Sequence, residues 1–415
     1  KLGKERDCEM IDVIILAAGP GKRLWPITND IPKCMVRVLQ KPLLEWMAEG
    51  VFPFARKIIV IVGGHKEKVV AHFERTPLAS KIVFVEQAEQ KGTAHALLCA
   101  EKHVEGNFLV LNGDNFFEPS FYERIEQEMQ KGFFLVGKRV ADKSPFGEIV
   151  EENGAFREIR EKTGSQAEGL INTNAFYGPK AFFDLLHNVP LSSRGELELV
   201  DAINDFAKKE KVRIVEQAGY WNDIGFYWNL LETSEFALRN LMKNEILGTV
   251  EQGVHVEGEL HLGEGSVIKA PSRIEGPVWV GENTIVGPNA FLRAGVCVED
   301  NCHIGSSEIK NSTIMSGSNA PHFNYVGDSI ICEDVNLGAG AIIANLRFDN
   351  KTIYSEIQGK NVSSGRRKLG CVIGAGTKIG INASFTCGKL IGGNCKIYPR
   401  VFIKKNVPDS SVIME

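Results

Sequence analysis

A glycine-containing segment near the N-terminus carries two cations that could act on phosphates. The segment LAAGPGKRLWPITNDIPK occupies residues 16–33 and includes Arg23 and Lys33. Its glycines allow backbone N–H groups to approach a triphosphate closely, and the cations can neutralise charge on a phosphate in transfer. The segment matches neither the P-loop pattern nor the full G-x-G-x-x-G dinucleotide fingerprint. A tight turn between a strand and a helix would contain the same glycines, so both interpretations stay open on these residues alone.

A second group of polar side chains lies in SNAPHFNYVGDS, at residues 318–329, and includes His322 and Tyr325. Neutral imidazole is the side chain suited to accept a proton near pH 7, so His322 is a candidate general base. A single histidine within a repetitive scaffold is more often structural. The choice between these interpretations decides whether the chain carries one activity or two.

Composition limits the class of protein to which these segments belong. The 415 residues, 43% hydrophobic and 24% charged, predict a soluble globular chain of two or three domains. The net charge of -4 gives no reason to expect a nucleic-acid partner. No apolar run reaches the roughly 18 residues of a membrane span, and residues 1–9 lack a signal-peptide core. We therefore expect a cytoplasmic protein with no membrane partner, whose nine cysteines, with no C-x-x-C pair, are reduced.

The first half must position the glycine-containing segment on a sheet. Buried strands are expected at residues 12–19, 57–64, 81–87 and 108–114. Helical patterns follow at residues 42–51 and 93–104, and the alternation predicts an α/β, doubly wound, mostly parallel sheet. Ligands of such sheets bind at the carboxyl ends of the strands. Those ends carry the glycine turn, Gln87 and Asp114.

The second half has a six-residue period. Every sixth residue from Val256 to Ile304 is aliphatic, and a second run with the same step extends from Ile373 to Ile403, with one phenylalanine in it. This period is the signature of a parallel β-helix, in which the sixth-position side chains stack inside a prism and about 18 residues complete one coil. His322 lies between the two runs, where the step slips.

The change of period also divides the chain. The expected domains are an α/β domain at residues 10–225, a linker helix at 226–249 and a β-helix at 250–415. Residues 345–369 leave the repeat altogether and contain SSGRRKLG. Irregular sites on rigid repeats are where function tends to concentrate, although loop insertions alone can also cause such irregularities.

With these elements in place, residues 16–33 resemble the signature of sugar-1-phosphate nucleotidyltransferases, and further segments follow in that family's order. QAEQKGTAHA, from Gln87, resembles its base-reading segment. The resemblance implies nucleotide-binding residues Leu16, Ala17, Ala18, Gly19, Gly21, Gln87, Gln90, Gly92 and Thr93. NGDNFF and YWNDIG resemble the segments that hold Mg²⁺, which implies Asp114 and Asp223 as metal ligands. Arg23 and Lys33 are the implied catalytic cations.

Three more segments, SPFGEIV, REKTG and LINTNAF, resemble the sugar-binding segments of the same family. They imply sugar contacts from Gly147, Glu161, Lys162, Asn172 and Thr173. A further segment, RGELELVDAI at residues 194–203, is interpreted as a helix start with charged solvent-facing side chains. The implied reaction is in-line attack of a sugar 1-phosphate on the α-phosphorus of a nucleoside triphosphate. The nucleophile is already an anion, so positioning and charge neutralisation suffice.

The second half resembles the acetyltransferase domain of the bifunctional N-acetylglucosamine-1-phosphate uridyltransferase / glucosamine-1-phosphate acetyltransferase family. The matching segments are FLRAG, EIKNS, PHFNYVGD and VNLGAGAIIANLRFDNK. The resemblance implies catalytic His322, with Arg293, Lys310, Tyr325, Asn336, Asn345 and Lys351 binding the amino-sugar phosphate. It also implies acetyl-CoA as co-substrate, a left-handed coil, and a homotrimer formed through the flat faces of the prism.

The resemblance implies a bifunctional enzyme. It would transfer acetyl from acetyl-CoA to glucosamine 1-phosphate or galactosamine 1-phosphate. It would also transfer a nucleotide from UTP or dTTP to N-acetylglucosamine 1-phosphate or glucose 1-phosphate, giving UDP-N-acetylglucosamine or a related sugar nucleotide. The alternative is a monofunctional glucose-1-phosphate nucleotidyltransferase whose β-helix only assembles subunits. The sequence leaves base and epimer open, because uracil and thymine differ by one methyl group.

Two features depart from the bacterial members. ANLRFDNK, at residues 344–351, replaces a tyrosine-glycine version and is similar to the archaeal branch. The chain ends at Glu415 without the longer tail that helps to hold coenzyme A in bacterial members. Arg366, Arg367 and Lys368 are candidate substitute ligands for the coenzyme phosphates, and a solvated basic loop is equally compatible with their composition.

Overall fold

The computed structural model contains two compact units and describes residues 10–152, 155–161, 164, 166–193 and 195–415. By their contacts, the first unit consists of Lys1–Pro20, Ile31–Val36 and Pro42–Asp223, and the second consists of Gly21–Asp30, Arg37–Lys41 and Ile224–Glu415. Two short segments near the N-terminus therefore group with the C-terminal half of the chain.

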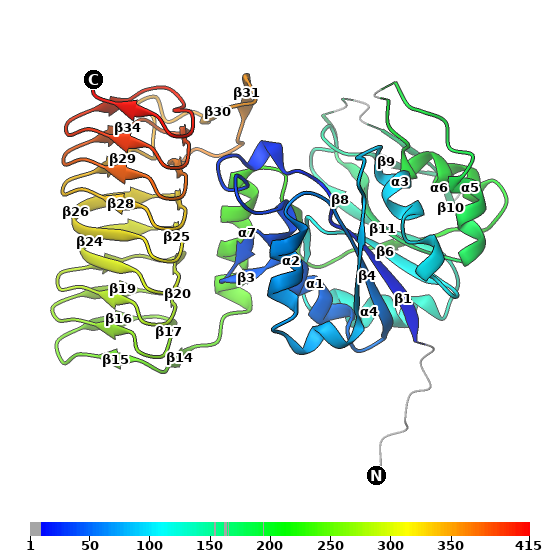
Figure 1. Ribbon diagram of the computed structural model, residues 1–415, viewed down its shortest axis with the longest axis horizontal. Coiled ribbons are helices and arrows are strands. Elements are labelled where there is room, and N and C mark those ends of the chain that lie inside the picture. Colours follow the sequence, from blue (N-terminus) through cyan, green and yellow to red (C-terminus); the bar gives the residue numbers. More distant parts are fainter. Residues whose placement is uncertain (1–9, 153–154, 162–163, 165, 194) are drawn as a thin grey trace, which may run out of the picture. The chain divides into compact units, whose positions relative to one another are not determined.

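A sheet with a parallel centre forms the first unit (Figure 1). Its central strands run in the order β6 (Phe108–Asn112), β1 (Ile11–Leu16), β4 (Ala55–Val62) and β5 (Ile82–Glu86). The register places Leu16 beside both Asn112 and Ile61, so the carboxyl ends of these strands lie together. The apolar runs predicted these four strands, and their parallel pairing confirms the α/β sheet.

An antiparallel part extends this sheet on the β6 side. It contains β8 (Phe134–Val140), β9 (Glu148–Glu152), β10 (Ala155–Arg160) and β11 (Gly169–Gly178), and β12 (Arg213–Glu216) is added beside β8 in a parallel pairing. Strand β11 joins it to the centre, because β11 pairs antiparallel with β6, β8 and β9. The pairing brings three segments together that are distant in sequence: the start of β9, the end of β10 and the middle of β11.

Helices cover both faces of the sheet. They are α1 (Leu43–Val51), α2 (Lys66–Phe73), α3 (Thr93–Leu98), α4 (Ser120–Met129), α5 (Phe183–Leu186) and α6 (Leu199–Ala207). Val13 and Ile15 of β1 belong to a core with α1 and α4, whereas Ile14 belongs to a core with α3 and α6. This alternation is expected for strands buried on both faces. Among the described helices, none is long and apolar enough to cross a bilayer.

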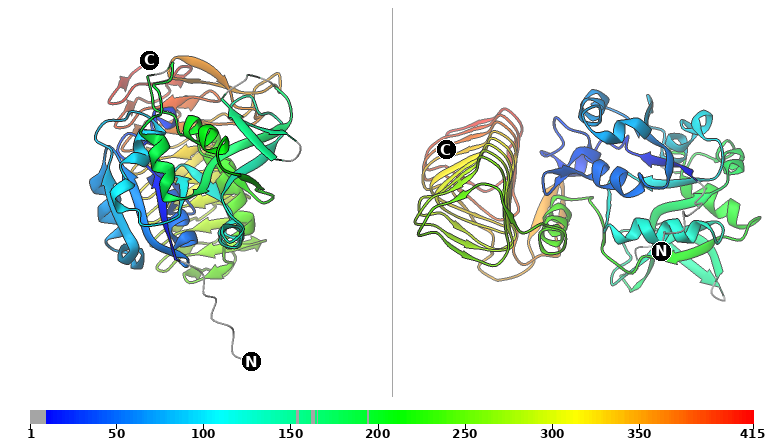
Figure 2. Two further views of the ribbon diagram at one scale, coloured as in Figure 1. Left: turned by 90° about the vertical axis from the view of Figure 1, so that its right-hand side faces the viewer. Right: turned by 90° about the horizontal axis from the view of Figure 1, so that it is seen from below.

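The second unit contains a parallel β-helix, as the hexapeptide period predicts, and its sheets of parallel strands are consistent with the left-handed coil that the family resemblance implies. One sheet consists of β14 (Glu245–Ile246), β17 (Leu260–Leu262), β20 (Val278–Val280), β23 (Val296–Val298), β25 (Thr313–Ile314), β27 (Ile330–Ile331), β32 (Val372–Ile373) and β35 (Leu390–Ile391). Leu262 pairs with Val280 and Val280 with Val298, so these coils take 18 residues each. Figure 2 shows the coils superposed as a prism in its right-hand view.

The interior of the prism contains the predicted sixth-position side chains. Leu262, Val280, Val298 and Ile304 are completely buried in one core. Val256 is the exception in the first run, with 37% of its side chain exposed. It lies in the first coil, β16 (His255–Glu257), which pairs with a following coil on one side only.

The coils become irregular where the six-residue step slips. Strands β24 (His303–Lys310) and β26 (Asn319–Gly327) are longer than the others and pair in parallel, with a register shift between Ser306 and Glu308. The excursion after Asn345 forms an antiparallel hairpin, β30 (Tyr354–Ile357) and β31 (Lys360–Ser363). The structure thus confirms that residues 345–369 leave the repeat.

Helix α7 (Tyr227–Asn240) belongs to the second unit and packs against β23. It corresponds to the predicted linker helix, and Tyr227 is completely buried. The two N-terminal segments of this unit are also bonded to the β-helix. The indole of Trp25 and the amide of Asn29 donate to the carboxylate of Asp409 over 3.1 and 2.6 Å. The β-helix therefore carries elements from both ends of the chain.

Candidate active sites

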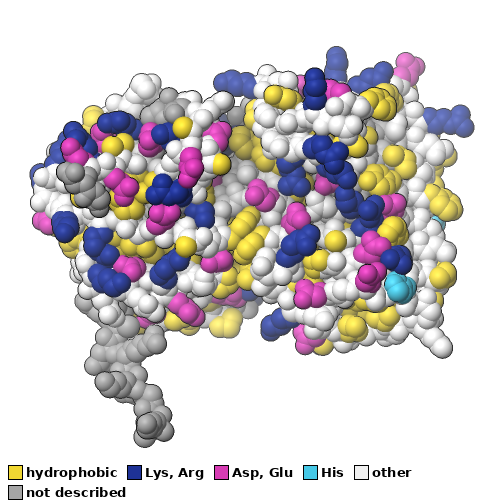
Figure 3. Space-filling model, turned by 180° about the vertical axis from the view of Figure 1, so that it is seen from behind, with side chains coloured by type: hydrophobic (Ala, Val, Ile, Leu, Met, Phe, Trp, Pro, Cys, Tyr) yellow, Lys and Arg dark blue, Asp and Glu magenta, His cyan; other side chains and the backbone are white. Residues whose placement is uncertain are grey.

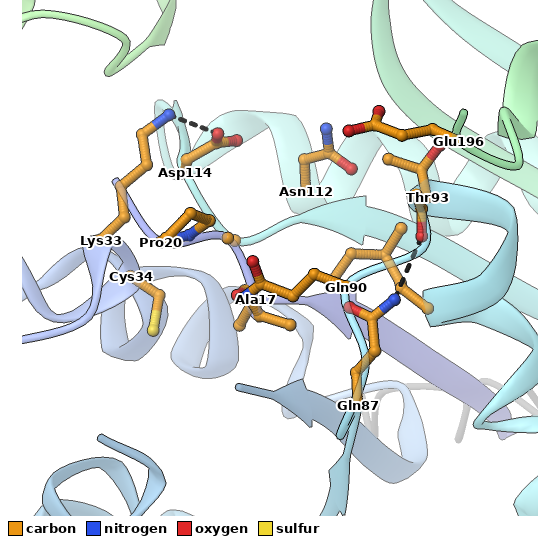
Figure 4. A pocket seen from close by; sticks show the side chains of 16 residues that line it. Ala17, Pro20, Lys33, Cys34, Gln87, Gln90, Thr93, Asn112, Asp114 and Glu196 are labelled. Carbon is orange, nitrogen blue, oxygen red and sulfur yellow. Dashed lines mark hydrogen bonds and ion pairs between the residues drawn. The ribbon is translucent and has the colours of Figure 1, made fainter. Parts of the chain in front are cut away.

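A pocket opens in the first unit at the carboxyl ends of β1 and β6 (Figure 4). Its lining is Leu16, Ala17, Ala18, Gly19, Pro20, Lys33, Cys34, Gln87, Gln90, Gly92, Thr93, Ala96, Asn112, Gly113, Asp114 and Glu196. Ten of these residues were predicted from the sequence: eight of the nine nucleotide-binding residues, with Lys33 and Asp114. Parallel strands end at one edge of a sheet, which explains why residues almost 100 positions apart meet there.

Two glutamines form one side of the pocket. Gln87 is buried, and its amide donates to the carbonyl of Gly92 over 3.2 Å and lies 3.0 Å from a ring nitrogen of His95. The amide of Gln90 donates to the carbonyl of Ala18 over 2.8 Å. The segment predicted to read a base is therefore bonded to the glycine turn that follows β1.

Position 92 requires glycine for two reasons: its backbone has a positive φ, and a side chain there would have no room. Its φ is 102°, and a Cβ there would lie 2.5 Å from the carbonyl oxygen of Leu197. The backbone N–H of Ala94 donates to that same oxygen over 2.9 Å. This contact brings Glu196 into the pocket lining. Sequence analysis assigned its segment only to a helix start, which α6 confirms from Leu199 onward, and missed Glu196 because its neighbour in space is 104 residues away in the chain.

Lys33 lies between two carboxylates. Its ammonium group is 2.5 Å from Asp114 and 3.6 Å from Asp223, and the lysine is almost fully buried. Asp114 precedes β7 (Asn115–Phe117), and β13 (Trp221–Asp223) pairs with β7 so that Asp223 lies opposite Asn115. Figure 4 shows the lysine turned toward Asp114 across the pocket from the glutamines. This pairing brings two predicted metal ligands together over a gap of 109 residues.

The donor set at Asp114 and Asp223 fits a hard divalent cation. Mg²⁺ takes one or two carboxylates together with waters and phosphate oxygens, and two carboxylates beside Lys33 meet that requirement. In the described ranges there is no group of three or more His, Cys, Asp or Glu side chains that could hold a metal ion. Cys34 adjoins Lys33, and burial raises the pKa of its thiol to about 12, so it is a neutral wall of the pocket.

The predicted sugar-binding residues lie at the antiparallel corner of the sheet. The N–H of Asn172 donates to the carbonyl of Gly147 over 2.8 Å, and a Cβ at Gly147 would lie 2.9 Å from the Glu161 carboxylate. Thr173 is buried, and its hydroxyl donates to Val136 over 2.9 Å, so that hydroxyl holds β11 in place. Lys162, the remaining predicted sugar ligand, lies outside the described residues.

Of the residues predicted to bind the nucleotide or to act as its catalytic cations, Gly21 and Arg23 do not line this pocket. Both belong to the second unit, and the guanidinium of Arg23 lies 4.8 Å from the ring centre of Phe226. A cation over an aromatic face is held electrostatically as well as by contact. Gly21 has a φ of 65°, the left-handed conformation that glycine adopts without strain.

A second site lies on the β-helix, where three coils stack in register. Glu308 pairs with Tyr325, and Tyr325 pairs with Ile342. The hydroxyl of Tyr325 donates to the side-chain oxygen of Asn345 over 3.4 Å, and the amide of Asn345 donates to the buried carboxylate of Asp328 over 2.6 Å. Predicted residues Tyr325 and Asn345 are thus joined, through Asp328, into one polar chain.

Two predicted cations stand at the same corner of the coils. Arg293 follows β22 (Phe291–Leu292), and its N–H donates to the carbonyl of Ile309, the residue before Lys310. The Arg293 guanidinium also donates to Glu308 over 2.8 Å. Sequence analysis missed Asp328, which ends the PHFNYVGD segment, because nothing in that segment shows that its carboxylate faces inward between two asparagines.

His322 lies in β26 with its side chain exposed, in register with Ser306. The backbone of the next residue, Phe323, is in the left-handed conformation with a φ of 52°. This large residue is also 73% exposed. Asn324 is buried and holds this turn: its amide donates to Gly338 over 2.7 Å, and its N–H donates to Ser307 over 3.0 Å. Such backbone conformations persist where the surroundings impose them, and they cluster at functional sites.

The last two predicted residues are less closely joined to this cluster. Asn336 begins β28 (Asn336–Leu337) and pairs with Asn319, at the opposite end of β26 from Tyr325. Lys351 is exposed in the excursion, and its backbone N–H donates to Asp349 over 3.2 Å. The structure therefore brings Arg293, Lys310, Tyr325 and Asn345 together at one corner, and it shows no contact of His322, Asn336 or Lys351 with that group among the described residues.

Comparison with known proteins gives relatives of both halves of the chain. Residues 12–240 match the nucleotidyl transferase family. The chain is 39% identical over 406 residues to a protein of Methanocaldococcus jannaschii named bifunctional protein GlmU, covering 97% of each chain. It is 40% identical over 395 residues to a bifunctional sugar-1-phosphate nucleotidylyltransferase/acetyltransferase of Sulfurisphaera tokodaii, covering 95% of this chain and 97% of that one.

A solved structure also matches the first half. It comes from Bacillus anthracis, is described as a glucose-1-phosphate thymidylyltransferase, and superposes with a TM-score of 0.51 at 25% identity. It covers 56% of this chain and 97% of its own. The matches at 39% and 40% identity extend over both halves. The chain therefore belongs to the nucleotidyl transferase family and, over nearly its whole length, to the bifunctional sugar-1-phosphate nucleotidylyltransferase/acetyltransferases.

Proposed function

We propose that the first unit transfers a nucleotide from UTP or dTTP to N-acetylglucosamine 1-phosphate or glucose 1-phosphate. The observation that carries this proposal is the buried Lys33 between Asp114 and Asp223 at the mouth of the pocket. An oxygen of the sugar phosphate attacks the α-phosphorus, the bond to the β-phosphate breaks, and pyrophosphate leaves. Lys33 neutralises the negative charge that gathers on the phosphates, and Arg23 is assigned the same role from the sequence.

In this proposal, different residues of the first unit bind the triphosphate, the base and the sugar. Backbone N–H groups of Ala18 and Gly19 would face the triphosphate, and Gln87 would bond the pyrimidine edge. Asn172 and Glu161 would bond sugar hydroxyls. Asp114 and Asp223 would hold Mg²⁺, which supplies further charge neutralisation to the phosphates when it is bound.

The second unit, in this proposal, acetylates glucosamine 1-phosphate or galactosamine 1-phosphate with acetyl-CoA. The amine nitrogen forms a bond to the thioester carbonyl carbon, the carbon–sulfur bond breaks, and coenzyme A leaves as the thiol. His322 accepts the proton that the amine gives up. Arg293, Lys310 and Lys351 are the proposed phosphate ligands, and Tyr325, Asn336 and Asn345 would bond the sugar. The strained turn at Phe323, held by Asn324, supports a role for the adjacent histidine.

The remaining assignments concern assembly and location. We infer a homotrimer formed through the faces of the β-helix, and Figure 3 shows apolar side chains at several places on the surface of that unit. Exposed apolar side chains there are Ile285, Phe323, Ile342, Phe348, Ile381 and Phe402. Such side chains are usual at interfaces between subunits. A cytoplasmic location and a division into domains at residues 10–225, 226–249 and 250–415 complete the proposal.

A substrate screen tests this function directly. Acetyl-CoA is offered with glucosamine 1-phosphate and galactosamine 1-phosphate, and UTP and dTTP are offered with the acetylated and plain sugar phosphates. The proposal expects one amino-sugar phosphate to be acetylated and the product to be coupled to a nucleotide. Nucleotidyl transfer without any acetyl transfer would instead favour the monofunctional alternative, in which the β-helix only assembles subunits.

A further inference from the structure

Residues 21–30 form a turn between two residues that line the nucleotide pocket. Pro20 directly precedes this turn, Lys33 follows it closely, and both belong to the lining of that pocket. Inside the turn, the hydroxyl of Thr28 donates to the carbonyl of Gly21 over 3.0 Å. This bond closes the turn into one compact piece, so a displacement of one part of it moves the rest.

The carboxylate of Asp409 fixes this turn to the β-helix. Asp409 precedes β38 (Val412–Ile413), which pairs in parallel with β36 (Lys396–Ile397). One carboxylate oxygen accepts from the indole of Trp25 over 3.1 Å, and the other accepts from the amide of Asn29 over 2.6 Å. Two side chains of the turn therefore bond one anion, and hydrogen bonds to a charged acceptor are stronger than bonds between neutral groups.

The backbone of the preceding coil orients that carboxylate. The N–H of Gly393 donates over 2.7 Å to the same oxygen of Asp409 that accepts from Asn29. In return, the N–H of Ser410 donates to the carbonyl of Gly393 over 2.8 Å. The direction of the carboxylate is thus set by the stacking of two coils, before the turn at residues 21–30 is considered.

Arg23 is the proposed catalytic cation that this turn carries. It lies in a single 3₁₀ turn, Lys22–Leu24, and its guanidinium is 4.8 Å from the ring centre of Phe226. The Phe226 ring is itself stacked on Trp228, with 4.5 Å between the ring centres. Arg23 is exposed, and a cation over an aromatic ring is held only weakly at an exposed site. Its position therefore depends also on the backbone that carries it.

The position of Arg23 is next to the segment that contains a proposed metal ligand. A Cβ on Gly225 would lie 3.3 Å from a guanidinium nitrogen of Arg23, so glycine leaves room for the cation there. Gly225 follows Asp223 by two residues in the chain. A guanidinium beside this segment can act on the phosphates that Asp223 would help to hold, provided that the turn stays in place.

We propose that Asp409 is a positioning residue for nucleotidyl transfer, which holds Arg23 in place through Trp25 and Asn29. The inference rests on the proposed nucleotidyl transfer and on the role assigned to Arg23 in it. A residue of the β-helix thereby supports the reaction of the first unit, in addition to the acetyl transfer proposed for the second unit.

Steady-state kinetics of Asp409→Ala and Trp25→Phe test the proposal, with Asn406→Ala as a matched control. Trp25→Phe removes one donor of the turn and leaves the bond between Gly393 and Asp409. Asn406 lies three residues before Asp409 and accepts from the N–H of Leu390 over 3.0 Å, so the control loses a similar bond between coils.

We expect kcat for nucleotidyl transfer to fall about 10- to 100-fold in Asp409→Ala, since a misplacement of about 1 Å can cost about 100-fold. Trp25→Phe should give a smaller loss, because the bond from Asn29 remains. KM for the sugar phosphate should stay within about twofold, because Arg23 acts on charge that develops in the transition state. All constants of the control should also stay within about twofold. Unchanged kinetics of Asp409→Ala, or an equal loss in the control, would overturn the proposal.

The Arg23→Ala background shows whether Asp409 acts through this arginine. There, Asp409→Ala should lower kcat no further, because the cation that it positions is already gone. An additional loss in the double variant would make Asp409 a structural residue of the coil and overturn the proposal. Full kcat in Arg23→Ala alone would remove the role of Arg23, and the proposal with it.

Hydrogen exchange in the whole protein separates this test from that of the proposed function. Backbone exchange of residues 21–30, followed by mass spectrometry, should become faster in Asp409→Ala, whereas β36 should keep its rate. Unchanged exchange in the turn would show that Asp409 does not fix it, and would overturn the proposal. If exchange rises but the wild type transfers no nucleotide, the proposed function fails, and only the attachment of the turn to Asp409 stands.

Discussion

Arg37 and Glu299 form a two-point ion pair between residues 262 positions apart in the chain. The guanidinium donates to the two carboxylate oxygens over 3.0 and 2.7 Å, and a further bond of 2.6 Å reaches Glu333. Glu299 is 1% exposed, and the N–H and hydroxyl of Ser316 donate to it as well. The pair attaches a segment that lies just after Lys33 in sequence to the wall of the β-helix.

Removing the arginine should destabilise the second unit. Arg37→Ala leaves a buried carboxylate without its cation, which costs roughly 3–5 kcal/mol. Chemical denaturation followed by circular dichroism, which reports the β-helix transition, measures this loss. Arg347→Ala is the control, because Arg347 pairs with Asp349 at an exposed turn, and its transition should not move. Equal transitions for the two variants would show that the Glu299 site tolerates an unpaired charge.

The cost of Arg37→Ala should grow with pH. Burial raises the pKa of Glu299 even with Arg37 present, and loss of the cation raises that pKa further. A carboxyl group whose pKa is raised by folding favours the folded state below its ordinary pKa and loses that contribution as pH rises through the folded value. Stability of Arg37→Ala relative to the wild type should therefore fall as the pH rises above the ordinary pKa of a glutamate carboxyl group. Arg37→Ala combined with Glu299→Gln should remove this pH dependence, since no carboxyl group remains to titrate.

Nucleotidyl transfer should depend on Asp223 and on a divalent cation, and acetyl transfer on neither. Asp223→Asn weakens the carboxylate pair around Lys33, so we expect a loss of about 100-fold or more in nucleotidyl transfer, comparable to removing an electrostatic donor. Chelation with EDTA should stop the same reaction. Asp205→Asn is the control, because Asp205 is an exposed carboxylate on α6 paired with Lys208. Acetyl transfer that collapses on chelation would contradict two separate sites.

Acetyl transfer should depend on His322 and not on its neighbour His303. His322→Ala removes the proposed base and should lower acetyl transfer by about 10²- to 10⁴-fold, with nucleotidyl transfer unchanged. Burial and the adjacent His322 lower the pKa of His303, which is therefore neutral near pH 7. His303→Ala should keep both the rate and the acid limb of the pH–rate profile. A shifted acid limb in that variant would assign the titrating base to His303.

Local pattern accounts for much of the fold and of the first site. Apolar runs predicted β1, β4, β5 and β6, and their carboxyl ends predicted that the glycine turn, Gln87 and Asp114 lie together. The six-residue period predicted the interior of the β-helix from Leu262 onward. These predictions succeed because alternation and period report which face of an element is buried, and because parallel strands end at one edge.

Other relationships depended on the tertiary structure. Asp328 and Glu196 owe their places to neighbours one coil or more than 100 residues away in the chain. Arg37 resembles an ordinary surface arginine until Glu299 is placed beside it. The sequence of this chain by itself determined which residues have side chains that can bind phosphate or accept a proton. Only the tertiary structure decided their partners, because charges and hydrogen bonds act over a few ångströms of space, regardless of the distance along the chain.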